Sequence, residues 1–185
     1  IISEVVGKAF DVIYEWYKYY GAADEHLNFI TVMKEEMIGS YHLCLDTVYT
    51  TPCGIISGSP LTVNLNSMVN QFYIRICWMQ LCGELEEYYR NVVTWTYGDD
   101  VLMSVSDSWI NRFNVSTMSE FFDTSLGIKF TNSDKSDQIV PWTHLGDCDF
   151  LKCKFIPWLE YPGQYMPGLA KNSIEEQINW IKNKV

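Results

Sequence analysis

Two adjacent aspartates, Asp99 and Asp100, follow Gly98 between two short runs of β-forming residues. Gly98-Asp99 suits a two-residue hairpin turn, because glycine readily adopts the positive φ that such turns require. Two carboxylates held side by side at a hairpin tip repel each other unless a cation joins them. Mg²⁺ prefers a few carboxylate oxygens together with water and substrate phosphates. The pair is therefore a candidate metal site; the alternative is an ordinary polar turn, where Asp is common.

Polar residues also mark the start of a predicted helix. Thr62 and Asn66 are four residues apart and share one helix face, while Ser57 and Gly58 precede them in a loop of small residues. A hydroxyl and an amide on one face, beside a flexible loop and helix-terminal amides, can contact a sugar hydroxyl and a phosphate. The alternative is that Ser and Thr cap this helix and that Asn66 is merely exposed.

The elements that must position these residues follow from hydrophobic periodicity and from glycine and proline. Ser59 and Pro60 suit the cap and the first position of the helix that carries Asn66. The spacing of Ser173 and Glu176 suits the opening of a last helix. The predicted elements are helices over 5–20, 25–38, 61–89 and 116–126, strands over 42–50, 92–97, 101–105, 128–131 and 150–156, and a connection over 157–168 before the last helix.

Strands interleaved with helices around a hairpin favour the α+β class, with helices packed on an antiparallel sheet. No run of about twenty uncharged apolar residues is present, so no membrane span is predicted. The six cysteines include no Cys-x-x-Cys pair, which favours reduced thiols in an intracellular protein over a zinc site.

Charge and the first residue bear on completeness. The net charge of −10 argues against a self-sufficient nucleic-acid binder, since phosphate neutralisation needs clustered Lys and Arg. The charged opening segment is unlike a signal peptide. The chain begins with Ile1, which favours a fragment or a processed polyprotein product.

Four ordered motifs resemble those of RNA-dependent RNA polymerases of positive-strand RNA viruses, in the picorna-like group. The resemblance implies a polymerase palm, an antiparallel sheet with a metal-binding β-hairpin backed by helices. In chain order the motifs are Ser57-Gly58-x-x-x-Thr62-x-x-x-Asn66-Ser67, Tyr97-Gly98-Asp99-Asp100, Gly127-Ile128-Lys129-Phe130 through Asp134-Lys135-Ser136, and Phe150-Leu151-Lys152.

The resemblance implies a nucleotidyltransferase that uses two Mg²⁺ or Mn²⁺ ions to join the primer 3′-hydroxyl to the α-phosphate of a nucleoside triphosphate. It makes Asp99 the principal metal ligand of the hairpin and Asp100 the lesser one. Thr62 and Asn66 would recognise the ribose 2′-hydroxyl. The loop of Ser57 and Gly58 would adjust as the nucleotide is accepted.

The resemblance assigns roles to three lysines. Lys135 matches the lysine that protonates pyrophosphate as a general acid, with an ordinary surface lysine as the alternative. Lys152 would lie near the primer backbone. The family often has a basic residue directly after it, whereas this chain has Cys153 and then Lys154, which strand alternation places on the face of Lys152. Lys154 is a second candidate for binding RNA as a substitute for that basic residue, although its face is not the face of Cys153.

By the same resemblance, residues 1–160 are a partial palm that lacks the first motif, and residues 161–185 begin the thumb. The fingers and most of the thumb would belong to the parent chain, so we expect the isolated chain to bind Mg²⁺ weakly and to extend no primer. The expected partners are RNA template, primer and nucleoside triphosphates, in the host cytoplasm at viral replication complexes. The alternatives are a non-catalytic palm-like scaffold and a reverse transcriptase palm.

Overall fold

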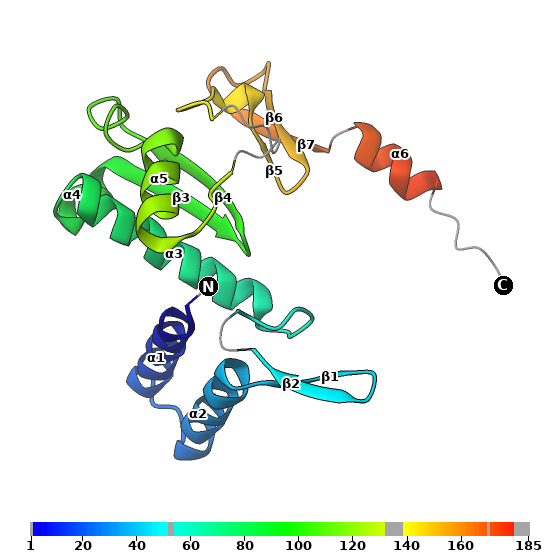
Figure 1. Ribbon diagram of the computed structural model, residues 1–185. Coiled ribbons are helices and arrows are strands. Elements are labelled where there is room, and N and C mark those ends of the chain that lie inside the picture. The colour runs from blue at the N-terminus through cyan, green and yellow to red at the C-terminus, as the bar shows by residue number, and fades with distance from the viewer. Residues whose placement is uncertain (1, 52–53, 132–138, 170, 180–185) are drawn as a thin grey trace. The chain divides into compact units, whose positions relative to one another are not determined.

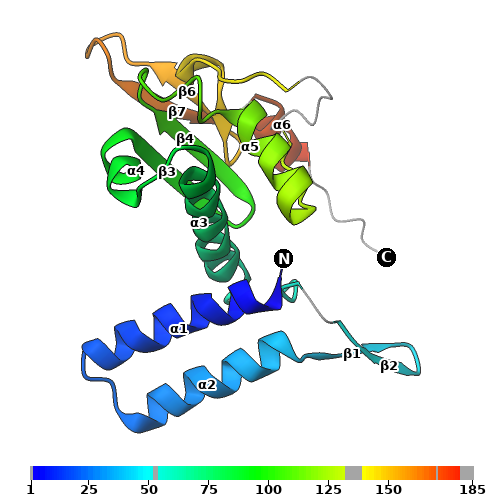
Figure 2. The same cartoon turned by 60° about the vertical axis from the view of Figure 1, so that its left-hand side comes forward.

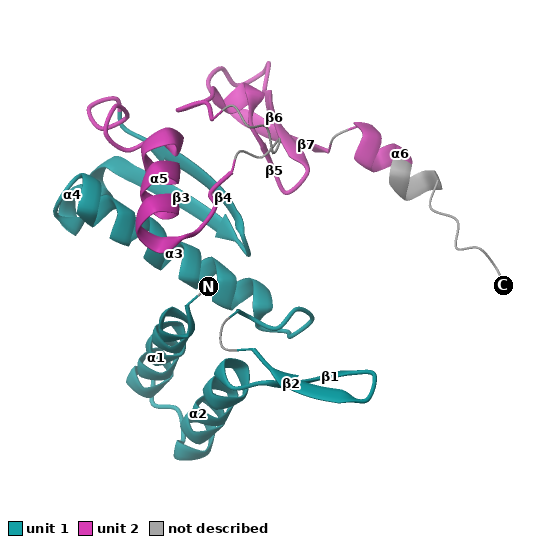
Figure 3. Cartoon of the chain, in the orientation of Figure 1, with its two compact units in different colours: residues 1–106 teal, residues 107–185 magenta. Residues whose placement is uncertain are grey.

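The computed structural model describes residues 2–51, 54–131, 139–169 and 171–179, which belong to two compact units, 1–106 and 107–185 (Figure 3). Among these residues, helices alternate with antiparallel sheets of two, two and three strands (Figure 1). The predicted α+β mixture is confirmed at that level. Within the same residues, no helix combines the length and the apolar character needed to cross a membrane.

The first unit opens with two helices, α1 (Ser3–Tyr19) and α2 (Asp24–Ile38), which lie side by side in Figures 1 and 2. Apolar side chains of both helices are buried, as the three- and four-residue spacing requires. Both predicted helices are confirmed. The buried apolar residues are Val6, Ala9 and Phe10 of α1 and Leu27, Ile30 and Met37 of α2.

A small hairpin follows, formed by β1 (Tyr41–Cys44) and β2 (Thr47–Thr50). The prediction of one strand over 42–50 is wrong, because the chain reverses at Leu45 and Asp46. Leu45 adopts a φ of +56°, a conformation for which a leucine gives no sequence signal.

Helix α3 (Thr62–Leu81) forms the centre of the first unit and is followed by the short α4 (Leu85–Asn91). The prediction of one helix over 61–89 is wrong, because Gly83 has a φ of +120° and ends the helical path. Oγ of Ser59 accepts a hydrogen bond from the amide of Leu61 at 3.3 Å, one residue before the helix begins. The most deeply buried residues of α3 are Leu65, Val69, Ile74, Cys77 and Trp78.

Strands β3 (Val92–Tyr97) and β4 (Asp100–Val105) form an antiparallel hairpin that contacts α3. Tyr97 pairs with Asp100, so Gly98 and Asp99 alone form the turn. The predicted hairpin is confirmed, with its second strand starting one residue earlier than expected.

In the second unit, α5 (Val115–Phe121) continues as a π-helix (Phe122–Leu126) and ends at Gly127, whose φ is +62°. The predicted helix over 116–126 is confirmed. Its start is fixed by a capping box, in which the Asn114 side chain accepts from the amides of Ser116 and Thr117. The strand predicted over 128–131 is wrong, since these residues pair with no strand among the described residues.

A one-turn 3-10 helix (Leu145–Asp147) leads into a three-stranded sheet of β5 (Asp149–Phe150), β6 (Cys153–Pro157) and β7 (Tyr165–Leu169). The single strand predicted over 150–156 is wrong, because Leu151 and Lys152 form a turn with φ values of +54° and +63°. Strand β7 also occupies part of the predicted connection over 157–168.

The last described helix, α6 (Lys171–Asn179), begins two residues before Ser173. The prediction that Ser173 opens this helix is therefore wrong. Instead, the Asn172 side chain accepts a hydrogen bond from the Ser173 amide at 3.0 Å. The division into palm and thumb at residue 160 stays a prediction.

Candidate metal and nucleotide site

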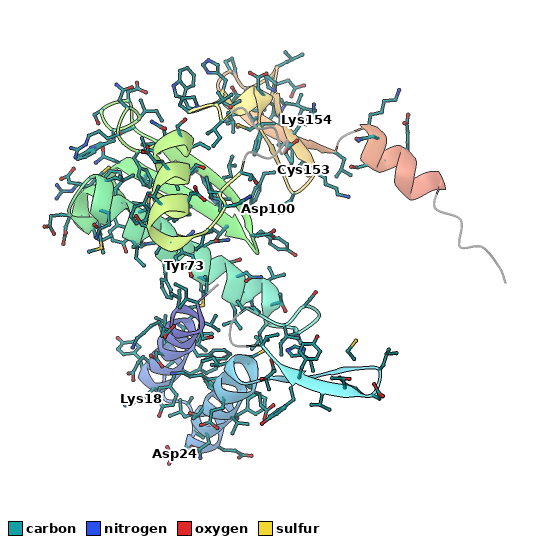
Figure 4. The ribbon with its side chains drawn as sticks, viewed as in Figure 1. Lys18, Asp24, Tyr73, Asp100, Cys153 and Lys154 are labelled. Atoms are coloured by element: carbon teal, nitrogen blue, oxygen red, sulfur yellow. The ribbon has the colours of Figure 1, made fainter. Side chains whose placement is uncertain are left out.

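The tip of the β3–β4 hairpin exposes both candidate carboxylates. Of the two turn residues only Gly98 has a positive φ, +63°, which is the pattern of a type II′ turn with glycine in its first central position. Asp99 and Asp100 are exposed, and Figure 4 labels Asp100 at this end of the hairpin. Neither carboxylate takes part in an ion pair within the described part of the chain. Two carboxylates on adjacent residues are thus exposed where a cation has access.

Helix α3 holds the turn through both polar backbone groups of Gly98. The Gly98 amide donates to Oγ of Ser67 at 2.8 Å, and the Gly98 carbonyl accepts from Nδ2 of Asn70 at 2.6 Å. Ser67 in turn donates its hydroxyl proton to the carbonyl of Val63 at 2.7 Å. The hairpin turn is therefore fixed to the helix by side chains and not only by its own strands.

A second set of contacts fixes strand β3 to the same helix. Nε2 of Gln71 lies 3.2 Å from Oγ1 of Thr96, which donates to the carbonyl of Ser67 at 3.3 Å. Arg75 donates to Oε1 of Gln71 and so orients the Gln71 amide. Sequence reasoning did not identify Asn70 or Gln71, although each lies four residues after a motif residue and so shares its helix face.

Thr62, Asn66 and Asn70 form one row along α3 at four-residue steps. Thr62 donates its hydroxyl proton to the carbonyl of Ile56 at 2.5 Å, so it ties the preceding loop to the helix. Oδ1 of Asn66 is buried and has no hydrogen-bond partner among the residues that the structure describes. An unsatisfied buried acceptor costs about 1–3 kcal/mol. Asn66 is therefore not merely exposed, and its oxygen has acceptor capacity that the described residues leave unused.

The loop before α3 has the accessibility that ligand contact requires. Ser57 and Gly58 form a turn and are both exposed. Gly58 has a φ of +89°, and a Cβ atom placed there would meet no atom of the described residues within 4 Å. Only backbone conformation, and not crowding, therefore favours glycine at this position.

The donor set suits a hard divalent ion in part. Both hairpin residues offer carboxylate oxygens, and Mg²⁺ is commonly held by one or two carboxylates together with water and substrate phosphates. The described residues contain no group of three or more His, Cys, Asp or Glu side chains that could enclose a metal ion. The hairpin can therefore supply part of a magnesium site, with further ligands from elsewhere.

Residues 5–185 match the family described as viral RNA-dependent RNA polymerase. The chain belongs to this family. It is 38% identical over 184 residues to the genome polyprotein of Deformed wing virus, covering 96% of this chain and 6% of that polyprotein. It is 28% identical over 191 residues to the replicase polyprotein of Cricket paralysis virus, covering 97% of this chain and 10% of that polyprotein. It is also 35% identical over 152 residues to the RNA1 polyprotein of Cherry rasp leaf virus, covering 77% of this chain and 7% of that polyprotein.

The resemblance to picorna-like viral polymerases, inferred from the ordered motifs, is thus confirmed. The chain spans only a tenth or less of the polyproteins it matches. The individual roles assigned to site residues stay predictions.

Of the three lysines to which the polymerase resemblance assigns a role, Lys135 lies outside the described residues. Lys152 lies in the β5–β6 turn, and Lys154 lies on β6 opposite Asp149 and Gly168 (Figure 4). Both side chains are exposed. The expectation that strand alternation puts them on one face is wrong, because Lys152 is not in a strand. Contact of both lysines with RNA stays a prediction.

Proposed function

We propose that this chain is the catalytic palm segment of an RNA-directed RNA polymerase, which adds ribonucleotides to a primer 3′-end on an RNA template during viral genome replication. The observation that carries the proposal is the exposed Asp99–Asp100 pair on a hairpin turn that is fixed to the helix of Asn66. Such an arrangement puts candidate metal ligands and a free hydrogen-bond acceptor on neighbouring parts of one unit.

Asp99 and Asp100 would hold the divalent ions of the reaction, Mg²⁺ or Mn²⁺. When bound, two such ions activate the attacking hydroxyl and stabilise the charge on the leaving pyrophosphate. The carboxylates of this chain would bind and orient the ions, and they lie at the tip of a hairpin whose Gly98 is hydrogen-bonded to α3, which would pre-organise them for the nucleotide.

Asn66 would distinguish ribonucleotides from deoxyribonucleotides. Its buried Oδ1 has no partner among the described residues and would accept a hydrogen bond from the ribose 2′-hydroxyl. Thr62 keeps the loop of Ser57 and Gly58 attached to the start of α3, and that loop would adjust around the incoming nucleotide. A deoxyribonucleotide would leave the Asn66 oxygen without a partner, which is the basis of the discrimination.

The remaining roles follow from family membership. Lys135 would protonate the leaving pyrophosphate, and Lys152 and Lys154 would contact the primer backbone. The parent polymerase would supply the fingers, the thumb and the remaining metal ligand, and would act at replication complexes in the host cytoplasm. The chain of residues 1–185 by itself would bind Mg²⁺ weakly and extend no primer.

The test is primer extension on an RNA template by the full-length parent polymerase. Asp99→Asn should lower turnover on the order of a hundredfold or more, as loss of a charge contact made in a transition state does. Asp46→Asn is the matched control, because Asp46 is also an exposed turn aspartate, between β1 and β2. It should leave turnover unchanged. Equal activity of the two variants would refute the proposal.

A non-catalytic, palm-like binding module is the second candidate, favoured by the net charge of −10. It predicts that the unsubstituted parent protein folds but makes no RNA with Mg²⁺ or Mn²⁺. Template-directed synthesis by that protein would exclude it.

A further inference from the structure

We propose that Asn70 and Ser67 are positioning residues that set where the Asp99 and Asp100 carboxylates lie, by locking the Gly98 peptides against α3. The inference rests on the proposed function and extends it to two residues that would touch neither substrate nor metal. It follows from the hydrogen bonds at the turn and from the planarity of the peptide bond.

The two hydrogen bonds act on consecutive peptide planes. The Gly98 amide belongs to the plane that joins Tyr97 to Gly98, and the Gly98 carbonyl belongs to the plane that joins Gly98 to Asp99. Ser67 holds the first plane at 2.8 Å and Asn70 holds the second at 2.6 Å. The rotation between these planes is set by φ and ψ of Gly98. Holding both planes therefore removes the freedom that a glycine would otherwise give the turn.

The anchors are themselves fixed. Gly98 is buried although it lies at a hairpin tip whose next two residues are exposed. Ser67 donates its proton to the Val63 carbonyl at 2.7 Å, which leaves an oxygen lone pair for the Gly98 amide. Asn70 and Ser67 both lie within α3, whose backbone is held by its own hydrogen bonds. The side chain of Asp99 thus follows directly after the second of the two held peptide planes.

The same helix carries Asn66, one turn before Asn70. Helix α3 therefore holds the acceptor proposed to bind the ribose and also fixes the hairpin proposed to hold the metal. The spacing of the ribose contact and the carboxylates is determined by one rigid element. Loss of either anchor should disturb the carboxylates while leaving the ribose contact in place.

Three variants of the full-length parent polymerase test the inference. Asn70→Asp removes the donor and turns a carboxylate toward the Gly98 carbonyl, and Ser67→Ala removes the acceptor of the Gly98 amide. Asn64→Asp is the matched control, since it makes the same chemical change on an exposed position of the same helix. The first readout, hydrogen exchange of a peptide covering 95–101, needs no catalysis.

Exchange at the turn should rise on the order of tenfold in Asn70→Asp and Ser67→Ala, which corresponds to one lost hydrogen bond. It should not change in Asn64→Asp. In polymerisation, the first two variants should need more Mg²⁺ for half-maximal rate and show a lower kcat, with the KM for the nucleotide nearly unchanged. Direct Mn²⁺ binding measured by electron paramagnetic resonance should weaken in parallel.

The inference is overturned if the turn exchanges as slowly in Asn70→Asp and Ser67→Ala as in Asn64→Asp. It is also overturned if these variants lose activity with the metal dependence unchanged, since a merely structural defect lowers the active fraction alone. Failure of the proposed function has a different signature. The unsubstituted protein would then make no RNA, while hydrogen exchange would still report whether the two anchors hold the turn.

Discussion

The indole of Trp78 donates a hydrogen bond to the carbonyl of Glu84 at 3.0 Å, across the break between α3 and α4. Trp78 is fully buried, and its ring contacts Tyr88 of α4 edge to face, with centroids 5.6 Å apart. The hydroxyl of Tyr88 lies 2.7 Å from that of Thr94 on β3. The break in the helix therefore lets α4 return along α3 and hold the strand that leads to the candidate metal site.

Gly83 should be indispensable to this break. Its φ of +120° is almost restricted to glycine, so Gly83→Ala should lower the free energy of unfolding by about 1–3 kcal/mol. Gly146→Ala is the control, because a Cβ there meets no atom within 4 Å in the part of the chain that the structure describes, and its φ is not in the positive range. Urea denaturation of the two variants, followed by tryptophan fluorescence, measures the difference. Equal stability of the two would show that the break does not depend on this backbone conformation.

Cys77 should be inert toward alkylation in the folded protein. Burial, and next the neighbouring Cys82, raise the pKa of its thiol from 9.0 to about 12, and only the thiolate reacts. Cys44 is exposed and should react readily. Iodoacetamide labelling at mildly alkaline pH, read by mass spectrometry of the peptides, compares the two. Denaturant should make both sites react, and rapid labelling of Cys77 without denaturant would contradict its burial.

The raised pKa of Cys77 also predicts how stability depends on alkaline pH. A folded-state pKa above the unfolded value means that the stabilisation is complete below pH 9.0 and is lost as pH rises toward about 12. The unfolded thiol ionises first and so favours unfolding. Cys77→Ala, although less stable near neutral pH because of the cavity, should lose less stability over that range. If the free energy of unfolding fell equally with pH in both proteins, ionisation of Cys77 would not be the cause of the alkaline loss of stability.

Asp11 should contribute a small, acid-sensitive stabilisation. Its hydrogen bond with Lys34, and next that with Lys8, hold the pKa of the carboxyl below its ordinary 3.8. The contribution is therefore present above that pH and is lost as pH falls through the folded-state pKa. Because the pair is partly exposed, Asp11→Asn should cost less than about 1 kcal/mol near neutral pH. Thermal unfolding at a series of pH values should show that the unfolding temperatures of the protein and of Asp11→Asn converge in acid.

Asn66 should set the preference for ribonucleotides. In the full-length parent, Asn66→Ala should reduce the ratio of kcat/KM for ribonucleotides over 2′-deoxyribonucleotides on the order of tenfold, the effect of one lost hydrogen bond. Asn64→Ala, at an exposed position of the same helix, should leave the ratio unchanged. Competitive incorporation of ribonucleotides and 2′-deoxyribonucleotides measures this ratio of kcat/KM values. An unchanged ratio in Asn66→Ala would remove Asn66 from sugar recognition.

Much of the fold that positions the candidate site was predictable. Helices α1 and α2 have regular apolar spacing, and the β3–β4 hairpin has a glycine at the turn position that needs a positive φ. The strands predicted over 42–50 and 150–156 are instead hairpins. Their turns place Leu45, Leu151 and Lys152 at positive φ, and these residue types give no turn signal.

The exposure of Asp99 and Asp100 was also predictable, because both residues lie at the tip of a tight hairpin. The anchoring of Gly98 by Asn70 was not. The two residues are 28 positions apart, and only the packing of the hairpin on α3 brings the amide and the carbonyl together. Asn70 and Gln71 are ordinary polar helix residues until that packing is known.

Iron-mediated backbone cleavage tests the central claim most directly, because Fe²⁺ can replace Mg²⁺ and cuts the chain near the atoms that hold it. The full-length parent with Fe²⁺, ascorbate and peroxide should be cut at residues 97–101 and near Asn66 at the start of α3. Excess Mg²⁺ should suppress both cuts, and Asp99→Asn should abolish them while Asp46→Asn leaves them intact. Cleavage that spares the hairpin, or that persists in Asp99→Asn, would contradict a metal site on this turn.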